Sequence, residues 1–155
     1  MDWKRRQVLY AGGGAGFLAE LASLGLLRPA AAREQTPRAG FVAKTVADVL
    51  SASGLAGAAD SAQVQLEAPE IAENGAVVPL KISSDLPRVD RIAILVEKNP
   101  VILSALFDLP EGTDPSIATR VKMAETCRII AVVRSDGKAY LASKEVKVTV
   151  GGCGG

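Results

Sequence analysis

The sequence predicts an all-β fold, an antiparallel sandwich of short strands over residues 64–150. About six or seven short segments in this range alternate apolar and polar residues with a period of two, as strands with one buried face do. Turn-forming pairs such as Asn74-Gly75 and Asp136-Gly137 separate these segments. Hydrophobic residues make up 48% of the 155 residues, which is enough to bury the core of one domain.

Residues 33–63, which precede the sandwich, are predicted to form a linker and one short helix. Residues 33–40 are polar and typical of a linker. The apolar residues that follow recur with the spacing of one helix face: Val42, Val46, Val49 and Leu50. The helix is expected to end at the small residues that lead to Gly54.

The strands are predicted from the alternating segments in chain order. The expected ranges are 64–67, 78–83, 91–96 and 101–107, then one long or broken strand over 119–124 and 127–134, and finally 139–142 and 146–150. Pro79 lies inside the second of these and has no amide hydrogen to donate, so we expect that strand at a sheet edge or a bulge.

One predicted strand, residues 128–133, has apolar residues at both its odd-numbered and its even-numbered positions. Both of its faces should therefore be covered. The core of the sandwich accounts for one face. Either the N-terminal helix or a partner subunit could cover the other, and the pattern does not separate these two alternatives.

Residues 1–32 resemble a twin-arginine signal peptide, with cleavage expected after Ala32. Arg5 and Arg6 precede a glycine-rich, moderately apolar stretch, although Lys4 stands where that signal usually has a serine or threonine. A membrane anchor is the alternative, but the charge and the glycines in the stretch make it a poor span. We expect a periplasmic protein that folds before export and has no permanent membrane span.

The composition excludes most enzyme classes. The sequence has no histidine, so it has no catalytic triad, no histidine metal site and no haem ligand of that type. Two cysteines cannot form a four-thiolate zinc site. A formal net charge of +1 and 4% aromatic residues do not favour nucleic-acid binding. We therefore expect no catalytic residues, no metal and no cofactor.

The candidate site is Cys153, which is flanked by four glycines: Gly151, Gly152, Gly154 and Gly155. Glycine buries no side chain and is costly to order, so the segment is predicted to be a flexible arm. It would carry the thiol about 10 Å beyond the last strand. No histidine accompanies the thiol, so its pKa should lie near the ordinary ~8.5 and its chemistry must come from another protein. The alternative is a tail that only forms intermolecular disulfides.

The second cysteine, Cys127, begins an apolar segment and is predicted to be a small buried hydrophobe. An intramolecular bridge between Cys127 and Cys153 remains open.

Four segments together resemble the SoxY family of the periplasmic thiosulfate-oxidising (Sox) system. They are residues 68–79 (APEIAENGAVVP), 97–100 (EKNP), 119–123 (TRVKM) and 151–155 (GGCGG). The resemblance implies an immunoglobulin-like sandwich paired with a similar SoxZ subunit. It also implies covalent attachment of thiosulfate at Cys153 by a c-type cytochrome complex, release of sulfate by a hydrolase, and oxidation of the remaining sulfur by a sulfur dehydrogenase.

The function predicted from these observations is a covalent sulfur carrier and not an enzyme. Two alternatives belong to other classes. One is an exported structural sandwich that uses Cys153 for cross-linking. The other is a conjugation modifier ending in two glycines, which the export signal and the cysteine within the tail disfavour.

Overall fold

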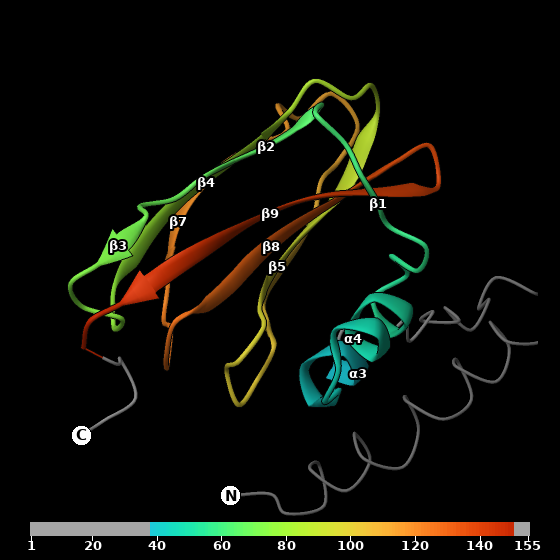
Figure 1. Cartoon of the computed structure of the whole chain (residues 1–155). Coiled ribbons are helices and arrows are strands. Elements are labelled where there is room, and N and C mark those ends of the chain that lie inside the picture. The colour runs from blue at the N-terminus through green and yellow to red at the C-terminus, as the bar shows by residue number, and fades with distance from the viewer. Residues whose placement is uncertain (1–37, 151–155) are drawn as a thin grey trace, which may run out of the picture. The chain divides into compact units, whose positions relative to one another are not determined.

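The chain forms two β-sheets and two short helices over residues 38–150, the part that the computed structural model describes (Figure 1). The helices are α3 (Arg38–Val42) and α4 (Val46–Ala52). The larger sheet contains, in spatial order, β1 (Ala59–Asp60), β9 (Lys138–Val148), β8 (Cys127–Ser135), β5 (Val89–Val96) and β6 (Leu103–Asp108), with β3 (Ile71–Ala72) also beside β9. The smaller sheet contains β2 (Val64–Glu67), β4 (Val78–Ser84) and β7 (Ser116–Val121).

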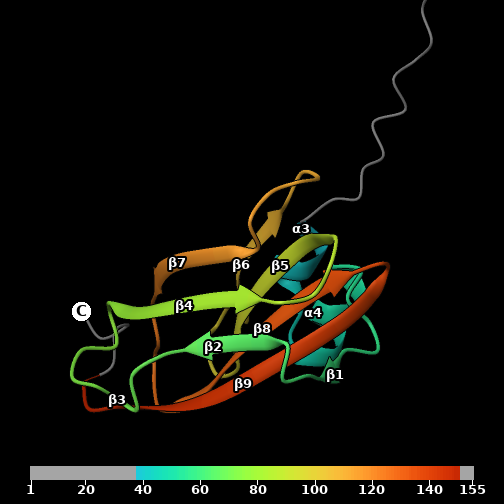
Figure 2. The same ribbon diagram turned by 90° about the horizontal axis from the view of Figure 1, so that it is seen from above.

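The predicted fold class, an immunoglobulin-like antiparallel β-sandwich with N-terminal helical structure, is confirmed. Figure 2 shows the smaller sheet lying over the larger one, and the helices lie on the far face of the larger sheet. The long strands pair antiparallel, and only the two-residue strands β1 and β3 pair parallel, both with β9. No helix within residues 38–150 is long and apolar enough to cross a membrane.

The main core lies between the two sheets, and the period of two in the sequence builds it. In β4, Val78, Leu80 and Ile82 are buried while Pro79 and Lys81 are exposed. Each such aliphatic side chain contributes about 1.5–3 kcal/mol through burial.

A second core lies on the other face of the larger sheet, beneath the helices. In β8, Ile129 and its alternate neighbours face the main core, whereas Ile130 and Val132 pack with Val49 of α4 and with Leu55. The same division holds in β5. Of the two alternatives for the doubly apolar strand, the structure therefore supports the helix as its cover.

The predicted single helix is two helices, and the break has a local cause. Thr45 is extended (φ −128°, ψ 153°) and caps α4, where its Oγ1 accepts a hydrogen bond from the amide of Asp48 at 3.1 Å. The same hydroxyl donates to the Asp48 carboxylate at 2.7 Å. Val42 is consequently 71% exposed and does not join the buried stripe. The predicted linker 33–40 overlaps a helix, because α3 begins at Arg38.

The edge position predicted from Pro79 is wrong for the strand as a whole, because β4 is the middle strand of the smaller sheet. The pairing register explains why a proline fits there. β2 pairs with β4 only as far as Glu67 opposite Lys81, whereas β7 continues to pair and places Arg120 opposite Pro79. At Pro79 one side of β4 therefore has no strand beside it, as proline requires.

The last strands differ in their bounds from the prediction. Residues 119–134 are broken, because β7 and β8 belong to different sheets. The turn between β8 and β9 is confirmed: Asp136 and Gly137 both have positive φ, 50° and 74°, which is typical of a two-residue hairpin. The predicted strands 139–142 and 146–150 are one strand, β9, which ends at Val148.

Candidate functional site

The site residues predicted from the sequence lie outside the described part of the chain. This applies to Cys153 and to its flanking glycines Gly151, Gly152, Gly154 and Gly155, and equally to Arg5 and Arg6 of the leader. The described chain reaches Val150, three residues before Cys153. The structure therefore defines the base from which the thiol segment departs, which we call the arm root, residues 147–150.

The arm root is fastened to β3 and to the turn that follows it (Figure 1). Four hydrogen bonds do this: Lys147 N to Glu70 O at 2.9 Å, Thr149 N to Ala72 O at 3.1 Å, Thr149 Oγ1 to Glu73 O at 2.9 Å, and Gly75 N to Val150 O at 2.8 Å. The chain is thus held by backbone pairing for two residues beyond the end of β9.

Two further connections meet the arm root at the same end of the sandwich. The amide of Met123, between β7 and β8, donates to Gly75 O at 2.7 Å. Asn99, between β5 and β6, donates from Nδ2 to Lys122 O at 2.7 Å and accepts at Oδ1 from the amide of Ala124 at 3.0 Å. Hydrogen bonds therefore join the segments 68–79, 97–100 and 119–123, which are far apart in the sequence, and Gly75 of the first segment bonds to Val150.

The surface at this end combines exposed valines with paired charges. Val77, Val101 and Val150 are 54%, 46% and 63% exposed. Arg128 forms a bidentate ion pair with Glu97, at 2.7 and 3.1 Å. The hydrogen bond from the Arg128 guanidinium lowers the pKa of Glu97 below its ordinary value, so the carboxylate stays ionised at neutral pH.

Cys127 is a buried hydrophobe, as predicted. It is 5% exposed in the main core, and among the described residues it is a free cysteine. Burial raises the pKa of its thiol, so the reactive thiolate is scarce at neutral pH. The thiol is therefore unsuited to nucleophilic chemistry.

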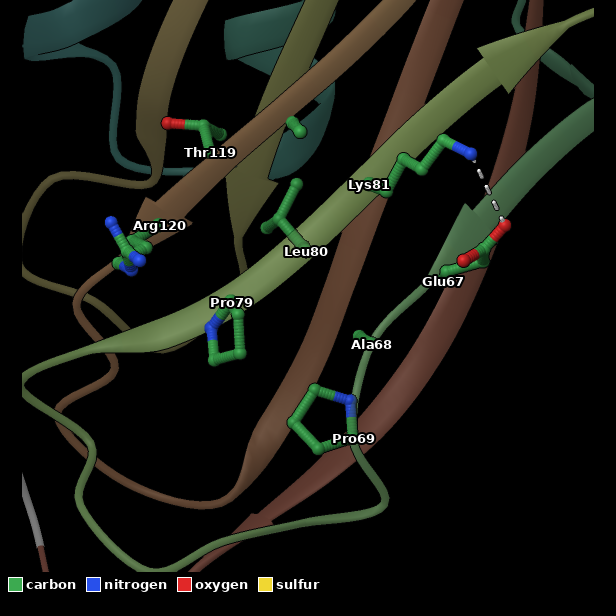
Figure 3. Close-up of a pocket in the computed structure, with 9 residues that line it drawn as sticks. Glu67, Ala68, Pro69, Pro79, Leu80, Lys81, Thr119 and Arg120 are labelled. Atoms are coloured by element: carbon green, nitrogen blue, oxygen red, sulfur yellow. Dashed lines mark ion pairs between the residues drawn. The ribbon is translucent and has the colours of Figure 1, made fainter.

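The described surface also carries hollows away from the arm root. One hollow of about 680 Å³ lies on the outer face of the smaller sheet (Figure 3). It is lined by Pro69, Pro79 and Arg120 among others, with an ion pair of 3.9 Å between Lys81 and Glu67 at its rim. Within residues 38–150, no cluster of carboxylates and thiols could hold a metal ion.

Sequence reasoning missed Gly75 and Asn99 as parts of this site. Both lie in segments that carried the family resemblance, but neither was given a role. The pair Asn74-Gly75 predicts a turn and nothing more, and the Asn74 side chain does accept from the amide of Ala76 at 2.8 Å. The spacing of the segments contains no signal for their contact, because the hydrogen bonds between them join residues more than twenty positions apart.

Comparison with known proteins agrees with the fold. The fold places the chain among two-sheet β-sandwich proteins of the immunoglobulin-like type. The model of the family described as sulfur oxidation protein SoxY matches residues 51–153, a span that includes the whole sandwich and Cys153. The chain belongs to the SoxY family.

Among solved structures, the chain is similar to the sulfur carrier protein SoxY from Chlorobium limicola f thiosulfatophilum. The identity is 38% and the TM-score is 0.55, over 60% of this chain and 86% of that one. An engineered protein is 12% identical with a TM-score of 0.39, and a chain from a structure described as the basis of T cell specificity and activation by the bacterial superantigen toxic shock syndrome toxin-1 is 11% identical with a TM-score of 0.37. They cover 57% and 55% of this chain and 21% and 98% of their own, and these likenesses carry no weight. A search of curated proteins gives no match.

Proposed function

We propose that this protein is a covalent carrier for thiosulfate oxidation that holds sulfur intermediates on the Cys153 thiol. The observation that supports it most is the family match, which extends through residue 153. The arm root adds support, because fixed backbone up to Val150 followed by glycines suits a thiol that moves between partners. Gly151, Gly152, Gly154 and Gly155 are the proposed swinging segment.

The loading step joins two sulfur atoms. The Cys153 thiol loses its proton to solvent, and its sulfur forms a disulfide bond with the outer sulfur of thiosulfate. Bond formation releases two electrons, which a c-type cytochrome complex accepts. The product is a cysteine S-thiosulfonate with one negative charge on its terminal sulfonate.

Two further partners complete the proposed cycle. A hydrolase adds water across the bond between the outer sulfur and the sulfonate, which leaves a cysteine persulfide and releases sulfate. A sulfur dehydrogenase then oxidises the terminal sulfur of the persulfide to a sulfonate: three water molecules supply the oxygens, and the six electrons released pass to a c-type cytochrome. Hydrolysis of the remaining bond between the cysteine sulfur and the sulfonate releases a second sulfate and restores the Cys153 thiol. In this scheme the protein contributes attachment and presentation but no catalytic group of its own.

The subunit partner and the compartment belong to the same proposal. We place the protein in the periplasm, exported through the twin-arginine signal of residues 1–32, as a heterodimer with a SoxZ-like subunit. The doubly apolar strand β8 no longer indicates the pairing surface, because α4 covers its second face. Co-purification of the two chains tests the pairing, and a stable monomer in excess partner would contradict it.

The substitution Cys153→Ser tests the function. We expect thiosulfate-dependent reduction of the cytochrome complex to be lost, with the fold and the subunit pairing retained, because Cys153 follows the sandwich in the sequence and the cores of the described residues are complete without it. Turnover close to that of the wild type would overturn the proposal. Intermolecular disulfides without thiosulfate adducts would favour the cross-linking alternative.

A further inference from the structure

The side chain of Asn99 bridges two backbone groups on the connection between β7 and β8. Its Nδ2 donates to Lys122 O at 2.7 Å, and its Oδ1 accepts from the amide of Ala124 at 3.0 Å. An amide side chain can donate and accept at once, which a carboxylate cannot do. The backbone of Asn99 is itself held, because its amide donates to Val96 O at 3.2 Å.

The residue between the two bridged groups is Met123, and it continues the connection toward the arm root. Its side chain is fully buried, and its amide donates to Gly75 O at 2.7 Å. Gly75 is buried as well, and its amide donates to Val150 O at 2.8 Å. Short hydrogen bonds, joined by the backbone of residues 122–124 and of Gly75, therefore link the Asn99 side chain to Val150, the last described residue before the glycines.

We propose that Asn99 is a positioning residue for Cys153. Asn99 acts through Met123 and Gly75 to hold Val150, which is the pivot of the thiol segment. The proposed role of Asn99 rests on the proposed carrier function. It assigns to that function a residue that is remote from Cys153 in the sequence. From a fixed Val150, Cys153 reaches about 10 Å at most. Loosening the pivot enlarges the volume that the thiol samples, and so lowers its effective concentration in a partner's active site.

The substitution Asn99→Asp isolates the bridge. It keeps the size of the side chain and the acceptor for the amide of Ala124, but it replaces the donor with an oxygen that faces Lys122 O at 2.7 Å. Asn74→Asp is the matched control. It adds the same charge at the same end of the sandwich, but the Asn74 hydrogen bond only accepts, from the amide of Ala76 at 2.8 Å, so aspartate retains it.

Two measurements on the full-length protein decide the proposal. Hydrogen exchange should show the amides of Gly75 and Met123 opening about tenfold faster in Asn99→Asp than in Asn74→Asp. In loading by the cytochrome complex with thiosulfate, the KM for the carrier should rise severalfold in Asn99→Asp, with kcat retained. Alkylation by iodoacetamide should stay confined to Cys153 in both variants, because a general loss of folding would also expose the buried Cys127 to the reagent.

Equal exchange in the two variants, or equal KM values, would overturn the proposal. If Asn99→Asp does not fold, Asn99→Ser must show the same pattern, because serine is too short to span both backbone groups. Wild-type protein that is not loaded at all would overturn the proposed function itself. Wild-type protein that is loaded normally beside an Asn99→Asp variant that behaves like its control would overturn only the role of Asn99.

Discussion

The two cysteines of this chain differ in what surrounds them. Cys127 lies in the main core, where burial raises the pKa of its thiol. Cys153 follows two glycines beyond the arm root. Because the thiolate is the reactive form, a raised pKa and lost access act together at Cys127 to suppress reaction. Under the proposed function, Cys153 is therefore the thiol that we expect to carry sulfur.

Alkylation with iodoacetamide tests this difference. We expect one thiol per native chain to react between about pH 7 and pH 8.5, and mass mapping should place the label on Cys153. A raised pKa means that Cys127 gains thiolate only at higher pH, so its labelling should lag throughout this range and appear after unfolding. Native Cys153→Ser is the control and should remain unlabelled. Rapid labelling of native Cys127 would contradict the assignment.

The glycines beside Cys153 provide a second test at the scale of the residue. Replacing Gly152 and Gly154 with valine stiffens the backbone and widens the segment. We expect every partner-dependent step to slow, with alkylation by a small reagent unchanged, since no charge has been added. Rates of loading and of alkylation should therefore diverge. An equal loss in both would show that the glycines tune the thiol instead of admitting it to a narrow channel.

Among the elements, α4 shows how a short helix completes the sandwich. The cap at Thr45 sets where α4 begins, and this directs Val49 onto the outer face of the larger sheet. That contact explains why β8 and β5 are apolar on both faces. A partner subunit is not needed to cover them.

Substitution of Ile130 tests the second core. In the isolated chain we expect Ile130→Ala to lower the free energy of unfolding by about 2–5 kcal/mol, because the residue is 6% exposed beneath the helices. Ile71→Ala is the matched control: Ile71 is 58% exposed and should cost about 0.5 kcal/mol or less. Urea unfolding measures both. Equal, small effects would mean that α4 does not cover β8 in solution.

At the scale of the whole molecule, local patterns predicted the sandwich well. Alternation in β4 and the Asp136-Gly137 turn depend on neighbouring residues, so the sequence shows them directly. The position of β4 in its sheet, the crossing from β7 to β8 and the division of the helix at Thr45 depend on partners or caps that a periodicity does not contain. Pro79 illustrates this. The inference that Pro79 itself lacks a strand on one side is correct, whereas the inference that the whole strand lies at a sheet edge is wrong.

The candidate site likewise has one part that the sequence shows and one part that it does not. Cys153 and its glycines stand out in the sequence because no core needs them. The arm root does not stand out, because the hydrogen bonds of Asn99 to residues 122 and 124, of Met123 to Gly75 and of Gly75 to Val150 form only when three distant connections fold to one end of the sandwich.

Mass spectrometry of the intact protein tests the carrier function most directly. The purified protein would be turned over with thiosulfate and the cytochrome complex, and its mass would be compared with that of Cys153→Ser treated in parallel. We predict a thiosulfonate adduct on the wild-type chain, mapped to Cys153, which a thiol reductant removes and which the variant lacks. A wild-type mass that stays unmodified during turnover, or an adduct that persists in Cys153→Ser, would contradict the account.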